Sequence, residues 1–356
     1  MTMGDENKPR KPQVSVFPFP LQGHINPVLQ FAKRLASKGV KATLVTTVFL
    51  SKSWFSDAYI DLQTVSDASM NAAIMVSQRR GLPADVLGTY SAATQLPLNS
   101  TVSLPGLPPL QVSELPSFIS DNGSSPAWFD VIVNQFSNVD GADWVFFNTF
   151  YELEKEVLDC MSSFWNVWTI GPTVPSIRQA EGLSRVRPFG SLASLEVEQM
   201  EELVWGLKAA GCNFLWETAE KAKLPSRFIE ETREKGLVVT WCHQLEVLSQ
   251  ESISCFLSHC GLNSILETLS LGVPVLAMPL WTDQNQIMNA KQVDDVWGIG
   301  IKARQNAKGL VIRDMIEQCL MELVKGEKGK EAKKNAIKWK NLAKNEKCNG
   351  RRWKFR

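Results

Sequence analysis

Residues 241–284 read WCHQLEVLSQESISCFLSHCGLNSILETLSLGVPVLAMPLWTDQ, and this stretch decides the fold class of the second half of the chain. Phe256-Leu257 is typical of a buried strand end, and His259-Cys260-Gly261 is typical of a turn. Asn263-Ser264 then opens a helix that we expect to run to about Ser270. A strand that leads through a short turn into a helix predicts a parallel α/β sheet.

The start of this predicted helix is suited to an anion, because its free backbone N–H groups and the positive end of its dipole point beyond the strand. His259 can add a donor there. Trp241 offers a flat face on which a base could stack, and Glu267 could accept hydrogen bonds from sugar hydroxyls. Asp283-Gln284 adds polar groups at the far end. The order of base, diphosphate and sugar favours a nucleotide-sugar as ligand.

These residues, in this order and spacing, resemble the signature segment of the plant secondary-product UDP-glycosyltransferases. The resemblance implies that Trp241 stacks on uracil, that Gln244 contacts the nucleoside and that Glu267 accepts from the ribose hydroxyls. It also implies that Asp283 and Gln284 hold the sugar hydroxyls. A closing Gln is typical of family members that use glucose.

The resemblance places the diphosphate at the predicted helix start, where the implied donor-binding residues are His259, Gly261, Asn263 and Ser264. Three positions depart from the family pattern. The family usually has Pro where His243 stands, His where Gln250 stands and a second Trp where Leu262 stands. Loss of that Trp removes an aromatic wall beside the sugar, which weakens the expected donor affinity but leaves the phosphate site.

Three structural explanations of the same residues stay open. Ser264 and Glu267 also form a capping-box pattern, in which the carboxylate reaches back to the helix start. A Trp at a strand end, such as Trp241, can belong to the core. A metal site would need Cys255, His259 and Cys260 plus a fourth ligand, which is absent at the usual spacing, so we expect no metal.

The first residues of the chain predict a second parallel α/β unit. Val14 to Phe19 is a short apolar strand, Asn26 is a natural N-cap with Pro27 at the first helical position, and residues 42–46 form the next strand. His24 falls in the loop at the carboxyl end of the first strand, where such sheets bind ligands. The stretch resembles the opening motif of the same family, which implies that His24 is the catalytic base.

A histidine base needs a partner that orients the ring and stabilises the imidazolium, and a carboxylate is the usual one. Asp67 is the best candidate, since it follows a short predicted strand and resembles the dyad aspartate of the family. The alternative is that Asp67 only caps a helix. The chain between His24 and Asp67 is shorter than in the family, so elements that would help to form the acceptor pocket are missing.

The domain boundaries expected from the sequence are 1–175 for an acceptor-binding Rossmann-like domain, 176–188 for a linker and 189–356 for a UDP-sugar-binding Rossmann-like domain. Phe189-Gly190-Ser191 resembles the family's strand end, which implies a donor-binding role for Ser191. The residues before it, Ser184 to Pro188, contain two arginines and a proline and are poor material for a buried central strand.

Composition narrows the class of protein. The chain has 356 residues, 38 Lys and Arg against 37 Asp and Glu, and seven cysteines. A formal net charge of +1 lacks the basic excess that is typical of nucleic-acid-binding proteins. Unpaired cysteine spacing suits a reducing compartment, and no run is apolar enough for a spanning helix. We therefore expect a cytoplasmic protein without stable membrane insertion, a monomer, with a basic and largely solvated C-terminal helix after Lys325.

The resemblance implies a GT-B type α/β fold of two Rossmann-like domains facing across a cleft, with elements missing from both. It implies metal-free transfer of glucose from UDP-glucose to a hydroxyl or carboxyl of a small hydrophobic acceptor, such as a phenolic, flavonoid or hormone, with inversion. One alternative is a truncated or degenerate member that binds nucleotide-sugar with little or no transferase activity. A nicotinamide-dependent Rossmann enzyme is a third hypothesis, disfavoured because no Gly-x-Gly-x-x-Gly turn follows either first strand.

Overall fold

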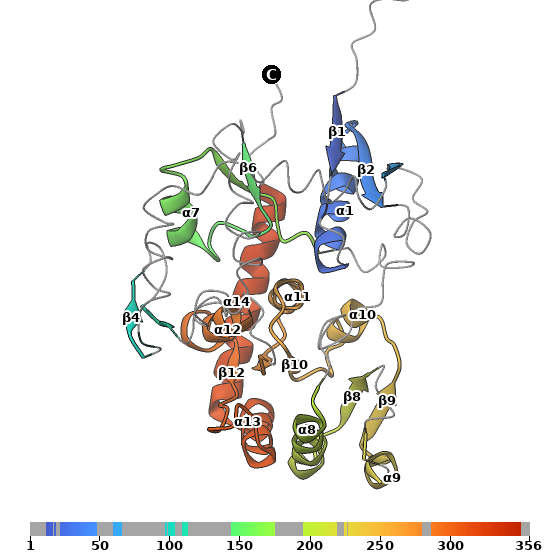
Figure 1. The fold of residues 1–356 in the computed structure, drawn as a ribbon, viewed down its shortest axis with the longest axis vertical. Helices are drawn as coiled ribbons and strands as arrows, with labels where there is room; N and C mark the ends of the chain where they lie inside the picture. Colours follow the sequence, from blue (N-terminus) through green and yellow to red (C-terminus); the bar gives the residue numbers. More distant parts are fainter. Residues whose placement is uncertain are drawn as a thin grey trace, which may run out of the picture. The chain divides into compact units, whose positions relative to one another are not determined.

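The structure is a computed structural model. It describes residues 12–16, 18, 22–47, 60–65, 97, 99–103, 109–112, 144–174, 195–218, 224–225, 227–279 and 286–349. The elements of these residues fall into two compact units, and each unit is described by itself. The first contains the N-terminal strands and helix, and the second contains the elements from residue 101 onward (Figure 1). The linker predicted at 176–188 lies outside the described residues, so the domain boundaries stay a prediction.

The first unit is a parallel sheet with one helix. Its elements in chain order are β1 (Gln13–Val16), α1 (Gln22–Ala36), β2 (Lys41–Thr47) and β3 (Asp61–Val65). The strand order is β1-β2-β3, and both pairs are parallel. The helix buries an apolar face through Ile25, Leu29 and Ala32. The predicted strand–helix–strand unit is therefore confirmed.

The predicted start of the first helix is wrong. α1 begins at Gln22, so His24 and Asn26 lie in its backbone and not in the loop before it, and Pro27 lies inside the helix. Pro lacks an N–H, so it gives up the bond to the carbonyl of Gly23, but only one bond is lost and the chain before it continues the helix. The preference for Pro at a first helical position did not decide this boundary.

The second unit begins with two small pairs of strands. β4 (Thr101–Val102) pairs antiparallel with β5 (Leu110–Gln111). β6 (Val145–Phe147) pairs parallel with β7 (Val167–Thr169), and α7 (Lys155–Met161) connects them.

The rest of the second unit alternates helices and strands as predicted. In chain order its elements are α8 (Val197–Ala210), β8 (Phe214–Glu217), α9 (Phe228–Thr232), β9 (Gly236–Val239), α10 (Gln244–Leu248), β10 (Phe256–Ser258), α11 (Leu262–Leu271), β11 (Val275–Ala277), α12 (Gln286–Lys291), a π-helical turn η5 (Gln292–Val296), β12 (Gly300–Lys302), α13 (Arg313–Lys325) and α14 (Glu327–Asn349). The strands form two parallel sheets, β8-β9 and β10-β11-β12. This alternation is the α/β class expected from residues 241–284.

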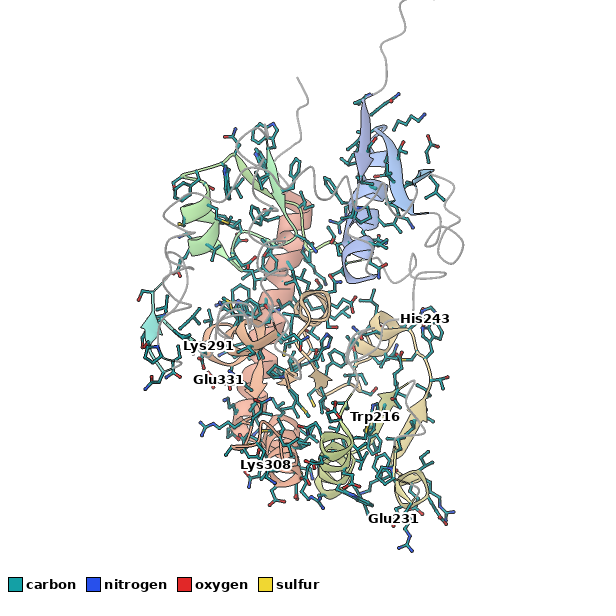
Figure 2. The ribbon with its side chains drawn as sticks, in the orientation of Figure 1. Trp216, Glu231, His243, Lys291, Lys308 and Glu331 are labelled. Atoms are coloured by element: carbon teal, nitrogen blue, oxygen red, sulfur yellow. The ribbon has the colours of Figure 1, made fainter. Side chains whose placement is uncertain are left out.

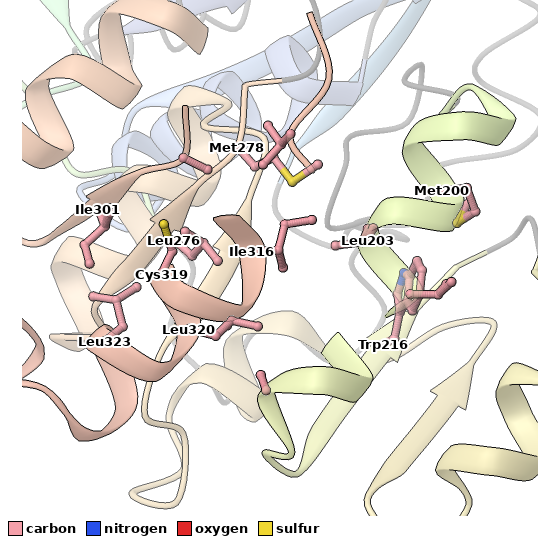
Figure 3. Packing of buried hydrophobic residues seen from close by; sticks show 14 of the residues in the cluster. Met200, Leu203, Trp216, Leu276, Met278, Ile301, Ile316, Cys319, Leu320 and Leu323 are labelled. Atoms are coloured by element: carbon pink, nitrogen blue, oxygen red, sulfur yellow. The ribbon is translucent and has the colours of Figure 1, made fainter. Parts of the chain in front are cut away.

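The main core of this part lies where α8 packs on α13. Leu203 and Ile316 face each other across the helix pair, with Leu320 one turn further along α13 (Figure 3). The buried Gln199 amide completes the contact, because it donates to Val311 O and accepts from Val311 N, each over 2.9 Å. The donor and the acceptor of the Gln199 amide thus both have hydrogen-bond partners inside the protein, so burying them costs little free energy.

The C-terminal helix differs in part from the expected solvated helix. Its lysines lie mostly on the exposed side, but Ala332, Ala336 and Ala343 are buried against the core. Trp339 donates from Nε1 to Trp297 O over 3.1 Å. α14 is therefore an amphipathic helix with a narrow buried stripe of small residues.

Gly206 of α8 makes the close approach of α13 possible. A Cβ at this position would lie 2.8 Å from Cβ of Ile316 and 3.0 Å from Arg313 O. Ala normally improves a helix by about 1 kcal/mol over Gly, but overpacking of a tight contact costs about 1–3 kcal/mol. We predict that Gly206→Ala lowers the free energy of unfolding by about 1 kcal/mol in urea titration. Glu201→Ala, on the exposed side of α8, is the control, and a stabilised Gly206→Ala would contradict the packing.

Candidate functional site

The turn between β10 and α11 is held by side-chain hydrogen bonds. Cys260 has a φ of +67°, a left-handed conformation that is uncommon for a residue other than Gly. Ser258 Oγ accepts from Cys260 N over 3.1 Å, and Asn289 Nδ2 donates to Cys260 O over 2.9 Å. These two bonds fix the peptide groups on both sides of the unusual residue. The turn thereby directs the chain sharply from the strand into the helix.

Gly261 is the N-cap of α11, and its lack of a side chain gives room to His259. A Cβ at position 261 would lie 2.5 Å from Nε2 of His259, so the imidazole lies over the helix start. Among the described residues, no side chain caps the helix and its first turn holds no acidic residue. The start of α11 therefore has the positive electrostatic character that suits a phosphate group.

The first residues of α10 meet the second turn of α11 in the interior. Gln244 Nε2 donates to Glu267 Oε2 over 2.6 Å and lies 3.4 Å from Ser264 Oγ. All three side chains are buried. The structure thus brings together three of the predicted donor-binding residues from segments about twenty residues apart.

The capping-box explanation of Ser264 and Glu267 is wrong. Gly261 is the N-cap, so Ser264 is the third residue of the helix rather than its cap. The carboxylate of Glu267 lies one turn further and accepts from Gln244. It does not reach back to the helix start, because the helix begins earlier than the pattern assumed.

Burial raises the pKa of Glu267 to about 7, and the hydrogen bond from Gln244 acts weakly in the opposite direction. Removing a carboxylate from water disfavours its charged form. A group with this pKa holds a proton at mildly acidic pH and loses it near neutrality. The ionised form has acceptor capacity beyond the single bond to Gln244.

Trp241 follows β9 and is 42% exposed, so it is not sealed in the core. Its ring meets the ring of His243 edge to face, with centroids 4.3 Å apart and planes at 70° (Figure 2 labels His243). His243 is in turn the N-cap of α10. The residue that departs from the family pattern therefore contacts the predicted stacking platform.

Glu217, at the carboxyl end of β8, is a neighbour of this site that the sequence analysis missed. Its Oε2 accepts from both N and Sγ of Cys242, each over 3.3 Å. Burial, together with this carboxylate, raises the pKa of the Cys242 thiol to about 12. The sequence signal for Glu217 was its position at the carboxyl end of a strand, where parallel sheets bind ligands. Asn289, which holds the α11 turn, had no local signal.

Several predicted site residues are not described. Ser191, Asp67, Asp283 and Gln284 lie outside the described residues, and for His24 only the backbone position in α1 is given. In the described part of the chain, no group of three or more His, Cys, Asp or Glu side chains could hold a metal ion. None of the helices described there is both long and apolar enough to cross a membrane.

Comparison with known proteins identifies the family. Residues 176–348 match the family model described as "UDP-glucoronosyl and UDP-glucosyl transferase". The chain is 35% identical to "Mogroside I-E synthase" from Siraitia grosvenorii, over 94% of this chain and 93% of the relative. The chain belongs to the UDP-glycosyltransferase family. It is also 34% identical to "Flavonol 7-O-beta-glucosyltransferase UGT74F1" from Arabidopsis thaliana, over 93% of both chains.

A solved structure shares the fold of this chain. Os79 from O. sativa, solved in complex with U2F and trichothecene, has a TM-score of 0.77 and 27% identity, over 93% of this chain and 95% of Os79. The predicted α/β fold of GT-B type is confirmed, and the nicotinamide-dependent alternative is wrong. The alignment to the mogroside synthase spans 434 positions against 356 residues here, so this UDP-glycosyltransferase is shortened relative to that protein.

Glu267 should make the stability of this glycosyltransferase depend on pH. Its folded pKa, about 7, lies above the ordinary 4.5, so its contribution is complete below about pH 4.5 and is lost as pH rises through 7. We predict that Glu267→Gln gains stability relative to the natural chain between pH 5 and 8, by about 3 kcal/mol. Urea unfolding across that range measures it. Glu198→Gln, an exposed carboxyl on α8, is the charge control, and parallel pH profiles for Glu267→Gln and the natural chain would contradict the burial effect.

Proposed function

We propose that this chain transfers glucose from UDP-glucose to a hydroxyl or carboxyl of a small lipophilic acceptor, with inversion at the anomeric carbon. The observation that carries the proposal is the meeting of Gln244, Ser264 and Glu267 behind the start of α11. A buried carboxylate with spare acceptor capacity suits a vicinal diol, and a bare helix start suits a diphosphate. The relatives named for glucosyl transfer support glucose and a small acceptor.

The donor-binding roles follow from this arrangement and from the family resemblance. The exposed face of Trp241 stacks on uracil, Gln244 contacts the nucleoside and Glu267 accepts from the ribose hydroxyls. The diphosphate lies at the α11 start, where the proposed contacts come from His259, Gly261, Asn263 and Ser264. Ser191 lies beside the diphosphate, and Asp283 with Gln284 holds the sugar hydroxyls. These assignments need no metal ion, because the helix start and the imidazole supply the positive potential.

The proposed chemistry is a single displacement. His24 takes the proton of the acceptor hydroxyl as its oxygen bonds to the anomeric carbon, and the bond from that carbon to the UDP oxygen breaks. Asp67 stabilises the imidazolium that results. Attack on the face opposite the leaving UDP inverts the configuration. We also propose that the protein acts in the cytoplasm as a monomer, with domains at 1–175 and 189–356.

A second candidate function is nucleotide-sugar binding with little or no transfer. The shortened chain favours it, because the missing residues include parts expected to form the acceptor pocket. Leu262, the first residue of α11, is 42% exposed where the family has a second Trp. Turnover of labelled UDP-glucose with a panel of phenols separates the two candidates, since only the transferase forms a labelled glucoside.

His24→Ala should abolish labelled glucoside formation and leave the UDP affinity within about twofold, because a base contributes about 10²–10⁴ to the rate and nothing to donor binding. A turnover assay measures glucoside formation, and a thermal-shift titration with UDP measures the UDP affinity. Lys33→Ala, on the same helix, is the control. A large loss of UDP affinity in His24→Ala would overturn the assignment of this residue as the base.

Trp241→Ala should weaken UDP binding by about tenfold or more, because stacking of a base on an aromatic ring contributes about 1–3 kcal/mol. Fluorescence-monitored melting at increasing UDP concentrations measures the change. Trp144→Ala provides a matched control, since Trp144 is a similarly exposed indole, 51%, just before β6. Equal UDP affinity in Trp241→Ala and Trp144→Ala would show that the base binds elsewhere.

A further inference from the structure

Trp241 and His243 lie in the short segment that joins β9 to α10, in which residues 241–243 adopt neither helix nor turn. The centroids of the two rings are 4.3 Å apart and their planes meet at 70°. Side chains two residues apart in an extended segment point to the same side, and the backbone of His243 is extended, with φ −78° and ψ 94°. The course of the backbone therefore allows the two rings to meet.

The backbone of this segment is anchored on both sides of His243. Cys242, the residue before it, donates from N and from Sγ to Glu217 Oε2, each over 3.3 Å. Gln244, the residue after it, is buried and donates to Glu267 Oε2 over 2.6 Å. The imidazole therefore projects from a backbone that is tied to β8 on one side and to α11 on the other.

His243 is the N-cap of α10, but its imidazole does not cap the helix (Figure 2). The side chains that stabilise a helix start as N-caps are mainly those of Ser, Thr, Asp and Asn. Here the backbone makes the first bond of the helix, because Val247 N donates to His243 O over 3.0 Å. Within the described part of the chain, the interaction that the imidazole makes is its contact with the Trp241 ring.

Trp241 gains most from such a support because its indole is partly exposed to solvent. Exposed side chains change rotamer readily. A base can stack on the indole in one orientation only, so the affinity falls in proportion to the time that the ring spends in other orientations. An edge-to-face contact favours one orientation by an amount that corresponds to about two- to tenfold in an equilibrium constant.

We propose that His243 is a positioning residue of the donor site, which holds the indole of Trp241 in the orientation that stacks on the pyrimidine base. This role rests on the proposed function, because it requires that Trp241 meets the base. The family pattern usually has Pro at this position, and a proline offers no aromatic ring. The edge-to-face support is therefore a feature of this chain that the family pattern does not supply.

The positioning acts on the base and not on the diphosphate. The proposed diphosphate contacts lie at the start of α11, which follows β10, whereas His243 and Trp241 follow β9. Pre-organisation of the indole raises the affinity for a ligand that carries a base, because less freedom is lost on binding. His243 therefore increases the selectivity of the site for UDP over a diphosphate without a nucleoside.

Calorimetric titration of the full chain with UDP and with inorganic pyrophosphate tests this selectivity. His243→Ala should raise the dissociation constant for UDP by about two- to tenfold and leave that for pyrophosphate unchanged. His243→Phe keeps an aromatic ring at the position and should restore the affinity for UDP. Phe164→Ala is the matched control, because Phe164 is also a half-exposed ring beside an indole, that of Trp165, and it should change neither constant.

Fluorine-19 NMR of the chain labelled with 5-fluorotryptophan tests the ring contact without any ligand. The resonance of Trp241 is the one that disappears in Trp241→Phe. In labelled His243→Ala this resonance should move, because a neighbouring aromatic ring shifts the resonances of nuclei close to it. The resonances of the other tryptophans and the melting temperature should stay as they are in the natural chain, which shows that the variant is folded.

The contrary outcomes separate this role from the proposed function. An unmoved Trp241 resonance in His243→Ala would overturn the ring support. Equal losses of UDP and pyrophosphate affinity, or a loss that His243→Phe does not restore, would show a general structural effect and overturn the positioning role. Unchanged UDP affinity in His243→Ala, with weakened binding in Trp241→Ala, would overturn that role and leave the stacking standing. Unchanged UDP affinity in both variants would overturn the proposed stacking on Trp241 as well.

Discussion

The hydrogen bond from Gln244 to Glu267 is the constraint on which the rest of the candidate site depends. It joins the start of α10 to the second turn of α11 inside the protein, where an unpaired carboxylate would be costly. The bond holds α10, and with it Trp241 three residues earlier, against the helix whose start faces the proposed diphosphate. The stacking platform follows β9 and the anion site follows β10, and these strands belong to sheets that share no strand in the described residues. The buried contact links the two parts of the site directly.

The surrounding structure supports that contact from both sides. α8 and α13 pack into a single core, helped by the close approach at Gly206 and the buried amide of Gln199. The β10–α11 turn is held independently through Cys260, Ser258 and Asn289. Among the described residues, packed helices and the left-handed turn at Cys260 therefore position the binding elements.

Local patterns in the sequence predicted the elements well, because strand, turn and helix signals act over a few residues. The α/β alternation and the helix after His259 follow from such signals. The helix boundaries were predicted less accurately. Pro27 suggested a helix start, but the helix begins five residues before it, and Ser264 suggested an N-cap, but Gly261 is the N-cap. Each error arose because a side-chain preference was outweighed by continuation of the helical backbone.

Long-range relations were largely beyond local patterns. The pairing of Gln244 with Glu267 spans 23 residues, and only the family resemblance placed both in one site. The role of Asn289 and the position of Glu217 beside Cys242 depend on tertiary packing that no short motif encodes. By contrast, the arginines and proline before Phe189 were recognised in the sequence as unsuited to a central strand.

The most direct test of the buried carboxylate as the ribose acceptor is calorimetric titration of the folded chain, with UDP and with 2′,3′-dideoxyuridine diphosphate, at pH 8. We predict that UDP binds saturably at one site and that the dideoxy analogue binds at least about tenfold more weakly, since hydrogen bonds to a charged group contribute about 1.5–3 kcal/mol. No heat with UDP, or equal affinity for the two nucleotides, would contradict it.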